Sequence, residues 1–409
     1  WKDINSLKKK IINYNFQRKE FYMKSICNNF FLIIILFGII SLLGDIVYEG
    51  VRSISGPFLA TLGATSLIIG FFSGLGEFLT QSLRLLFGYI SDKKKNYLPL
   101  MITGYLFICL LPFCGYTDSW KIVIFLLLLE RTGKAIRTPS RDTLISIVGK
   151  KIGVGRSFGI HELFDQIGAM IGPLIFFISL SKFKSYRYGF NIMWIPLIIL
   201  ISLLIILKKK YTYDGELKDE KTYQFVFRNK KFFLYILFVL FSVCGLVNFQ
   251  LISYHIKNKN IFHEAFIPIL YLNAMGVDGI IAFVVGRLYD ILKFKILLII
   301  PFLTFILPFL IFSDIIYLII LGIIFFGIII GCHETILRAA IADIVFLNKR
   351  GFAYGLFNTI YGLGFLISGW IIGFLYQQNL KIICFYTGLC EIIALCFLTS
   401  FIFNKKRSV

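Results

Sequence analysis

The sequence predicts an all-α integral membrane protein whose twelve transmembrane helices form two pseudo-symmetric six-helix bundles. The first observation is composition: of 409 residues, 58% are hydrophobic and 16% are charged, whereas soluble domains have about 45–50% apolar and about 25% charged residues. The second is that long apolar runs recur along the whole chain, which indicates lipid as the solvent. The third is that motifs of the first half return in register in the second half.

Each expected span is an apolar run bounded by polar residues and close to the roughly 20 residues that a helix needs to cross the hydrocarbon core. The first half holds runs at 29–50, 66–90, 97–116, 120–147, 157–180 and 188–207. The second half holds runs at 232–256, 264–290, 295–312, 315–340, 351–376 and 381–403. We therefore expect a basic tail over 1–28, bundles over 29–207 and 232–403, a linker over 208–231, and a second basic tail over 404–409.

The formal net charge of +21 comes from Lys and Arg that gather in the short gaps between the apolar runs. With the N-terminus inside, most of these gaps fall on one side, which the positive-inside rule makes cytoplasmic. The sequence thus predicts a multi-pass protein of the cell membrane with both termini in the cytoplasm. The Lys and Arg residues are then expected to face the lipid bilayer at its cytoplasmic surface, and nucleic acid is not an expected partner.

The start of the chain carries one further expectation. It opens with Trp1 and a Lys-rich stretch, whereas Met23 lies directly before the first apolar run. We expect residues 1–22 to be an upstream extension and Met23 to be the natural start.

The sequence predicts no cofactor, no metal site and no enzyme. Its eight cysteines are scattered, mostly inside apolar runs, with no CxxC pair and no histidine at metal spacing, so packing is their expected role. The phosphate-loop, HExxH and GxSxG signatures are missing.

Three features of the first half recur in the second. A glycine and an aspartate end both the second and the eighth span, an acid followed four residues later by a base lies in both the fourth and the tenth, and spaced glycines mark both the fifth and the eleventh. The pairs are Gly88 and Asp92 with Gly286 and Asp290, Glu130 and Lys134 with Glu334 and Arg338, and Gly159, Gly168 and Gly172 with Gly355, Gly364 and the pair Ser368-Gly369. Three repeats in register indicate a duplicated transporter fold.

These motifs resemble those of the major facilitator superfamily over nearly the whole chain. The family signature G-x-x-x-D-(R/K)-x-G-(R/K)-(R/K) is similar to Gly88, Asp92, Lys93, Lys94 and Lys95, without the glycine after the first base. The antiporter motif G-x8-G-x3-G-P is similar to Gly159, Gly168, Gly172 and Pro173. The segment ERTGKAIRTPSRD at 130–142 resembles the fourth-span motif of a poorly characterised bacterial and archaeal subgroup. The arginine that drug exporters of the family carry in this span is absent, and Leu127 lies near its expected position. The resemblance implies a monomer that works by alternating access, with the fifth-span motif favouring exchange.

Charged residues inside the spans are the candidate coupling groups. A charge at mid-membrane costs about 2.5–3.5 kcal/mol on insertion scales, so it normally faces a partner or a water-filled cavity. In the first half these residues recur every three or four positions and so share helix faces. A carboxylate whose cationic partner is displaced can take up or release a proton. We predict proton coupling at Asp45, Glu49, Glu77, Glu130 and Asp165, against the alternative of ion pairs that only hold helices together.

The substrate cavity is expected between the halves near mid-membrane. Basic residues of the first half can attract an anionic group or neutralise the acids, and the second half offers mainly amides. The predicted lining is Arg52, Lys134, Arg137, Asn273, Glu334, Arg338 and Asn358. Hydrogen bonding between helices is the alternative role for the amides.

Residues near the cytoplasmic ends are expected to form an inner gate. An aspartate at the end of the second span can accept hydrogen bonds from bases and from the N–H groups of a neighbouring helix N-terminus. The predicted gate is Gly88, Asp92, Lys93, Arg84, Arg141, Asp142, Glu162, Gly286 and Asp290. A static topology anchor is the alternative.

The leading functional hypothesis is a proton-coupled antiporter that exports a small amphipathic compound or metabolite by alternating access. It rests on the fifth-span motif together with the acids buried in the first half. The first alternative is proton-coupled uptake of a small polar or anionic nutrient, suggested by Lys134 and Arg137. The second alternative is a membrane sensor or scaffold that transports nothing.

Overall fold

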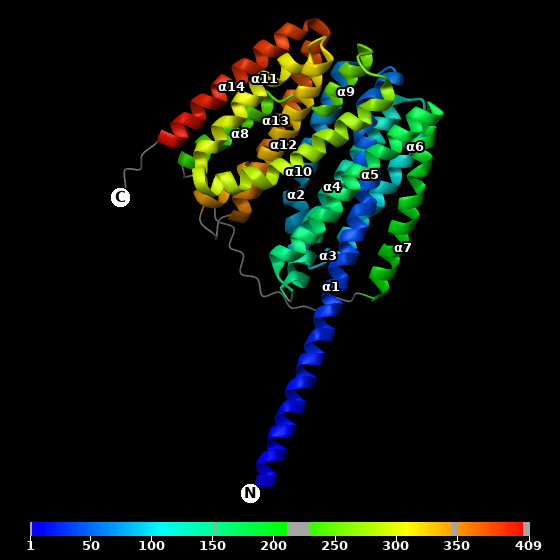
Figure 1. Cartoon of the computed structure of the whole chain (residues 1–409). Coiled ribbons are helices and arrows are strands. Elements are labelled where there is room, and N and C mark those ends of the chain that lie inside the picture. Colours follow the sequence, from blue (N-terminus) through cyan, green and yellow to red (C-terminus); the bar gives the residue numbers. More distant parts are fainter. Residues whose placement is uncertain (1, 151, 211–229, 346–349, 404–409) are drawn as a thin grey trace.

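The computed structural model describes residues 2–150, 152–210, 230–345 and 350–403, with side chains from Phe30 onward. The described residues are almost entirely helical, and the two halves of the chain lie side by side (Figure 1). Most of the predicted linker 208–231 and the predicted tail 404–409 fall outside the described residues. The side chains of the predicted tail 1–28 are also outside them, so the expectation about Met23 stays a prediction.

The described residues of the first half form seven α-helices and one 3₁₀ helix. They are α1 (Lys2–Thr61), α2 (Ser66–Lys94), α3 (Tyr97–Leu106), η1 (Phe107–Tyr116), α4 (Trp120–Gly149), α5 (Val154–Phe183), α6 (Tyr186–Ile192) and α7 (Trp194–Lys210). Each expected span of this half lies on one of these helices or on two consecutive ones. The first span is longer than predicted, because α1 continues past Pro57 to Thr61.

The second half begins with α8 (Lys230–Cys244) and continues to α14. The remaining elements are α9 (Phe249–Asn258), η2 (Glu264–Phe266), α10 (Ile267–Leu292), η3 (Lys293–Leu298), α11 (Ile299–Ile311), α12 (Ile316–Ile344), α13 (Arg350–Gln378) and α14 (Leu380–Phe403). The predicted seventh span is broken, since residues 245–248 between α8 and α9 leave the helix.

Nine helical stretches of the described chain are long and apolar enough to cross a membrane. One of them, Glu264–Ile311, covers the predicted eighth and ninth spans together. Helices α2 and α4 are long enough to span, but both carry several charged residues. The protein is thus an all-helical, multi-pass membrane protein, while the count of twelve spans stays a prediction.

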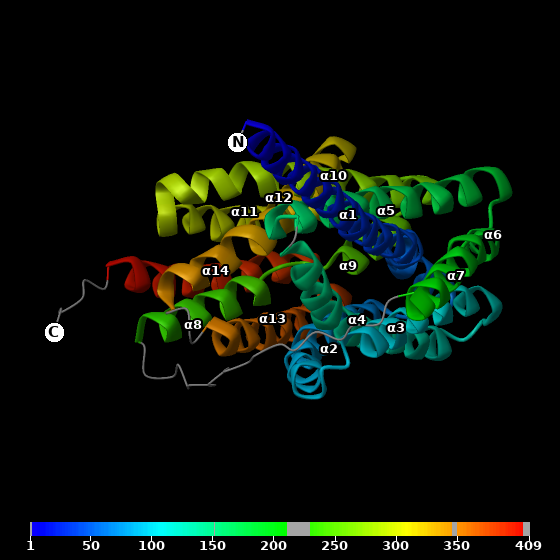
Figure 2. The same ribbon diagram turned by 90° about the horizontal axis from the view of Figure 1, so that it is seen from below.

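Each half packs around its own apolar core. One buried cluster lies almost wholly within the first half and another within the second, and Figure 2 shows the two sets of helices separated along a seam. At this seam α2 lies against α13, α1 against α9, and α5 against α10. Glycines permit the closest approach: a Cβ on Gly74 would lie 2.8 Å from Leu366 Cα, and one on Gly362 would lie 2.9 Å from Phe78 Cα.

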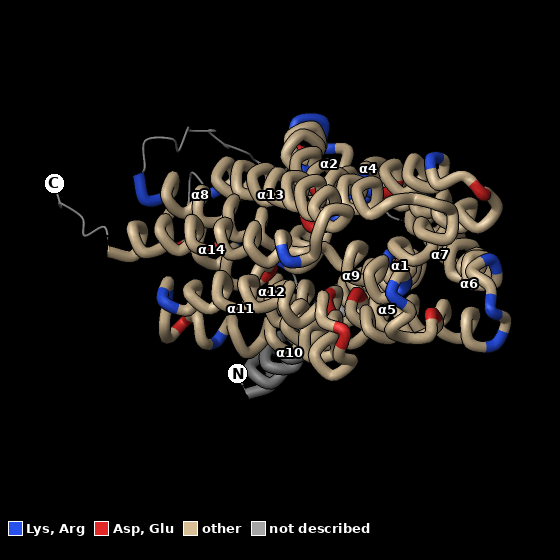
Figure 3. Tube along the Cα trace, turned by 90° about the horizontal axis from the view of Figure 1, so that it is seen from above, with Lys and Arg blue, Asp and Glu red and all other residues tan. Residues whose placement is uncertain are grey.

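The two ends of the seam differ. We call the end where α2 and α7 finish and α8 begins the tail side, and the end where α1 finishes and α2 begins the far side. At the far side Ser66 Oγ donates to the Gly373 carbonyl at 3.1 Å, and Ser73 Oγ donates to Gln250 Oε1 at 2.8 Å. Seen from above, acidic and basic residues lie near the middle of the molecule, around α9 and α12 (Figure 3).

Candidate functional site

A cavity of about 460 Å³ lies on the seam and is lined by residues of both halves. It receives side chains from α1, α2, α4 and α5 of the first half and from α9, α10, α12 and α13 of the second. The lining extends toward the tail side as far as Phe158 and Asp142. The predicted site residues on its wall are Asp45, Glu49, Arg52, Glu77, Arg84, Lys134, Arg137, Arg141, Asp142, Glu162, Asp165, Glu334 and Arg338.

The two walls of this cavity differ in chemistry. The first half contributes eleven charged lining residues and one aromatic residue, Phe158. The second half contributes three charged residues and six aromatic ones, which are Phe249, Tyr271, Phe326, Phe357, Tyr361 and Phe365. A ligand between the walls therefore meets charges on one side and mainly aromatic rings on the other.

A chain of ion pairs joins α1, α2 and α4. Arg52 NH2 lies 3.0 Å from Glu77 Oε1, and Arg52 NH1 lies 3.7 Å from Glu49 Oε1. Arg131 NH1 lies 3.1 Å from the same Glu77 oxygen and also donates to the hydroxyl of Tyr48. The three-residue spacing of Glu49 and Arg52 puts both on one helix face, as the sequence predicts. Arg131 was missed, although it follows Glu130 directly.

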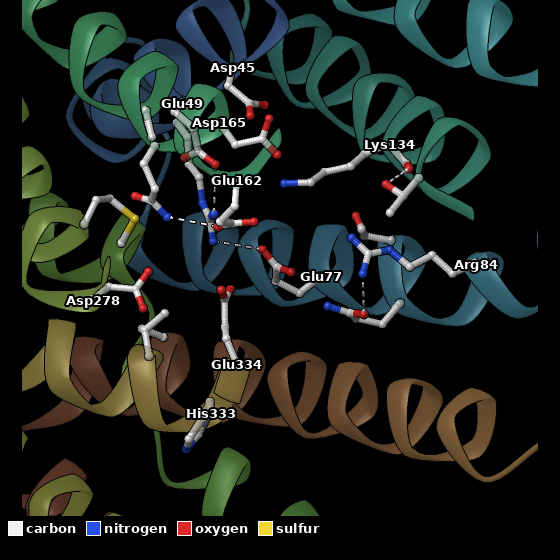
Figure 4. A pocket seen from close by; sticks show the side chains of 18 of the residues that line it. Asp45, Glu49, Glu77, Arg84, Lys134, Glu162, Asp165, Asp278, His333 and Glu334 are labelled. Atoms are coloured by element: carbon white, nitrogen blue, oxygen red, sulfur yellow. Dashed lines mark hydrogen bonds and ion pairs between the residues drawn. The ribbon is translucent and has the colours of Figure 1, made fainter. Parts of the chain in front are cut away.

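A second cluster surrounds Asp165 on the tail side of the cavity. Its Oδ2 lies 3.6 Å from Arg141 NH1 and 3.4 Å from His161 Nδ1. Figure 4 shows the carboxyl groups of Asp45 and Asp165 pointing toward one another, with the Lys134 side chain reaching toward the pair. The Lys134 ammonium also lies 4.0 Å from the ring centre of Tyr48. The arrangement brings two acids together on the cavity wall, with Lys134 and Arg141 as the bases beside them.

Glu130 is placed differently from the other predicted coupling acids. It lies 3.1 Å from Arg137 NH1, and the two side chains are only 2% and 3% exposed. Glu130 is absent from the cavity lining, whereas Arg137 reaches it. The structure thus gives Glu130 the environment of a buried ion pair within the first half, behind Arg137.

In the second half, some of the residues predicted to line the cavity lie on its wall and others do not. Glu334 and Arg338 of α12 reach the cavity, and so does Asp278 of α10. Asn273 is exposed on another face of α10, and neither it nor Asn358 is among the lining residues. The presence of an amide in a span does not predict that it faces a cavity, because burying an amide costs far less than burying a charge.

The predicted gate residues are divided between the cavity and the tail-side ends of the helices. Arg84, Arg141, Asp142 and Glu162 line the cavity, whereas Gly88, Asp92, Lys93, Gly286 and Asp290 lie beyond it. Asp92 accepts a hydrogen bond from the Tyr97 hydroxyl at 3.3 Å. In the second copy Asp343 accepts from Tyr289 and Lys293, at 3.1 and 3.4 Å, while Asp290 is exposed.

The fifth-span motif lies mainly against α1. A Cβ on Gly168 would lie 2.6 Å from the Leu42 carbonyl oxygen, and one on Gly172 would lie 2.6 Å from Gly50 N. Gly159 is exposed, with no other atom within 4 Å of such a Cβ. Pro173 lies within the continuous helix α5. Gly168 and Gly172 therefore permit close packing within the first half.

Polar contacts close the seam on the far side. Glu264 of η2 accepts from Tyr186 of the first half and from Lys257 of the second. Deeper along the seam, the Tyr271 hydroxyl donates to Glu49 across the two halves. The cavity is therefore covered on the far side.

Comparisons with known proteins agree with this architecture. A sequence model of the Major Facilitator Superfamily matches residues 27–369 and 265–408. An uncharacterised protein of Mycobacterium tuberculosis is 32% identical over 88% of this chain and 90% of its own length. An uncharacterised MFS-type transporter of Methanocaldococcus jannaschii is 27% identical over 94% of this chain and 98% of its own.

More distant relatives and solved structures extend the comparison. The multidrug resistance protein MdtH of Photorhabdus laumondii is 32% identical, but over only 30% of either chain. The nucleoside transporter NupG has a TM-score of 0.70 at 15% identity, covering 91% of this chain and 99% of its own. An inward-facing, unoccupied bacterial homologue of the lysosomal transporter Spinster has a TM-score of 0.63 at 14% identity, covering 91% and 95%. At sequence identities of 14% and 15%, these two comparisons show that the chain has the same fold as the solved structures, and nothing further.

Proposed function

The chain belongs to the major facilitator superfamily, and we propose that it is a proton-coupled antiporter exporting a small amphipathic compound or metabolite. It works in the cell membrane with its tail side in the cytoplasm, as the positive-inside rule predicts. The observation that carries this proposal is the cavity on the seam, with a charged wall from one half and an aromatic wall from the other.

The shape of the seam supports alternating access. The cavity extends toward the tail side, and hydrogen bonds at Glu264 and Gln250 join the halves on the far side. This arrangement supports a transporter that opens toward the tail side, which we propose to be the cytoplasmic side. Rocking of one half against the other would break the far-side contacts and bring the tail-side ends together.

The unlike walls support an amphipathic substrate. A charged or polar group can lie against the ion pairs of the first half, where Arg52, Glu77 and Lys134 offer both signs of charge. An apolar or aromatic part can stack on rings such as Phe326 and Phe365. A compound without a polar group would leave the charged wall without a partner.

The coupling group is proposed to be the pair of Asp45 and Asp165. Two carboxylates that point toward one another repel when both are charged, and a shared proton or the ammonium of Lys134 removes that repulsion. A substrate group that displaces Lys134 changes this balance and with it the number of protons bound. Asp165 also lies 3.6 Å from Arg141, so a movement of Arg141 would change the same balance. Glu49 and Glu77, which Arg52 and Arg131 hold, are proposed as supporting acids.

Import remains the alternative, and one observation favours it. Lys134 and Arg141 reach the cavity, so an anionic nutrient could bind there with a proton. The fifth-span glycines and the partial likeness to a multidrug resistance protein support export instead. A sensor or scaffold has the least support, since neither role requires a cavity between the halves.

Transport in proteoliposomes tests the proposal. The lumen carries a pH-sensitive dye, a proton gradient is imposed, and amphipathic metabolites of cationic, zwitterionic and anionic classes are screened. Exchange predicts that an effective compound moves protons in the opposite direction, and that Asp165→Asn abolishes this movement while Asp118→Asn, a change at an exposed loop, preserves it. Proton movement in the same direction as the compound would establish uptake, and transport by Asp45→Asn and Asp165→Asn with unchanged proton movement would refute the coupling site.

A further inference from the structure

The break in the predicted seventh span leaves irregular backbone inside the second half. Helix α8 ends at Cys244 and α9 begins at Phe249. The carbonyl of Gly245 accepts from Thr387 at 3.2 Å, and the carbonyl of Leu246 accepts from Ser368. Irregular backbone at membrane depth is tolerated where protein buries it or where it lines a cavity. Because the C-terminal end of α8 points its carbonyl groups into the break, this place favours positive charge.

A buried acid faces this break. Glu391 lies about midway along α14 and is 2% exposed. A Cβ on Gly245 would lie 2.6 Å from Glu391 Oε1, so the carboxyl group fills the space that the missing side chain leaves. Among the described residues neither carboxyl oxygen has a hydrogen-bond partner of normal geometry, although the Ser242 hydroxyl approaches the carboxyl group. A buried polar group in this state calls for an explanation, and a bound ion is one of the few.

Other polar atoms without partners lie at the same break. Ser242, one turn before Gly245, approaches Glu391, and its hydroxyl makes no hydrogen bond of normal geometry in the described structure. The side-chain oxygen and nitrogen of Asn248, at the other end of the break, are also buried and unpartnered, but this side chain lies beside Gly369 of α13. Carboxylate, hydroxyl and carbonyl oxygens are the ligands that hard cations prefer.

The charges near Glu391 favour a small monovalent cation. The titratable groups facing it are Cys244 of α8 and Cys390 of α14, with Tyr386 bonded to Cys390. Helix α11 carries no titratable residue, and the only charged residue of α13, Arg350, bonds to the carbonyl groups of residues 342 and 345. None of these groups can neutralise a carboxylate here. No group of three or more His, Cys, Asp and Glu side chains in the described residues could hold a metal ion.

We propose that Glu391, Ser242 and the backbone of residues 245–248 bind a small monovalent cation, either Na⁺ or a proton. In broken transporter helices, unwound carbonyls and helix C-terminal ends are the usual holders of these two ions. The site lies outside the seam cavity. Phe249, the first residue of α9, connects the two, because it directly follows the break and its ring lines the cavity. The centres of the Phe249 and Tyr271 rings are 4.7 Å apart. The inference holds for either direction of transport.

Thermal unfolding of the purified full-length protein in detergent tests this site. NaCl is titrated against choline chloride at constant ionic strength, at pH 6 and at pH 8, for the wild type, Glu391→Gln and Asp118→Asn. If Na⁺ is the ligand, it raises the Tm of the wild type and of Asp118→Asn by at least about 2 °C at pH 8, and Glu391→Gln loses this shift. If a proton is the ligand, Na⁺ has no effect, and Glu391→Gln loses the difference in Tm between pH 6 and pH 8.

The result that overturns the proposal is an equal response of Glu391→Gln and the wild type to both Na⁺ and pH. Should Glu391→Gln not fold, Ser242→Ala and Thr387→Val decide, because they keep the acid while removing one hydroxyl each. Either change should shift the half-saturating Na⁺ concentration, or the pH midpoint, by roughly three- to tenfold, the value of one neutral hydrogen bond. Unchanged midpoints in both variants would also overturn it.

Discussion

Arg131→Met removes one of the two guanidinium groups that hold Glu77. The Glu77 Oε1 atom lies 3.1 Å from Arg131 NH1 and 3.0 Å from Arg52 NH2. The Arg131 side chain is 7% exposed and that of Arg52 is 27% exposed. Methionine keeps the length and apolar packing of the arginine stem but not its charge. The change therefore tests whether the ion-pair chain between α1, α2 and α4 stabilises the first half.

The structure sets the expected size of the effect. Removing one partner of a buried ion pair costs about 3–5 kcal/mol when the other charge is left unpaired. Here Arg52 still pairs with Glu77, so we expect Arg131→Met to cost about 1.5–3 kcal/mol, the value of hydrogen bonds to a charged group. Arg52→Met should cost about 1 kcal/mol, since its pair is more exposed. The double variant leaves Glu77 with neither partner and should exceed the sum of the single changes by at least about 0.5 kcal/mol.

Reversible unfolding in mixed micelles, followed by circular dichroism, gives these free energies. The matched control is Arg131→Met in a Glu77→Gln background, where the arginine has no carboxylate to hold. We expect the cost of Arg131→Met to fall there by at least half. A cost below about 0.5 kcal/mol in the wild-type background, or an equal cost in both backgrounds, would refute the reasoning.

Three further changes separate packing, pairing and closure. Gly172→Val should lower the free energy of unfolding by about 1–3 kcal/mol through overpacking against α1, while Gly159→Val, at an exposed position, should leave the unfolding midpoint unchanged; equal effects would contradict the packing account. Glu130→Gln should destabilise the protein by about 3–5 kcal/mol and leave the number of protons moved per substrate unchanged in vesicles, so a changed ratio would make Glu130 a coupling acid. Glu264→Gln should weaken the far-side closure by roughly tenfold, read as faster labelling of Ala169→Cys by a membrane-impermeant thiol reagent from that side. An unchanged labelling rate would show that Glu264 does not hold the closure.

Charged residues were the most predictable part of the site. Because a charge in lipid is so costly, Asp45, Arg52, Glu77, Lys134 and Asp165 had to face a partner or a cavity, and all five line the cavity. Their helical spacing then fixed which of them share a face. The cost of placing a charge in lipid also predicts where the helices lie, because only the apolar runs between polar gaps can span the membrane.

The sequence does not predict which way each side chain points around its helix. Glu130 and Arg131 are neighbours, so they point about 100° apart on α4, and the sequence does not say which turns toward α2. The structure turns Arg131 to Glu77 and pairs Glu130 with Arg137. Asn273 does not line the cavity, and its direction was harder to predict because an amide is less costly to place away from water than a charge. Glu391 carries no repeat and no helical partner, so only the fold shows that it faces the break at Gly245.

The distribution of ion pairs bears on how the two halves move. Among the residues that the structure describes, every ion pair lies within one half, from Glu49–Arg52 in the first to Lys293–Asp343 in the second. The polar contacts that cross the seam are hydrogen bonds, at Ser66, Ser73 and Tyr271 among others. A hydrogen bond contributes about 0.5–1.5 kcal/mol between neutral groups and about 1.5–3 kcal/mol to a charged group, whereas breaking a buried ion pair costs about 3–5 kcal/mol. Since water or substrate can take over a hydrogen bond as the seam opens, each half can keep its internal ion pairs while the two rock apart, which is the mechanical condition that alternating access requires.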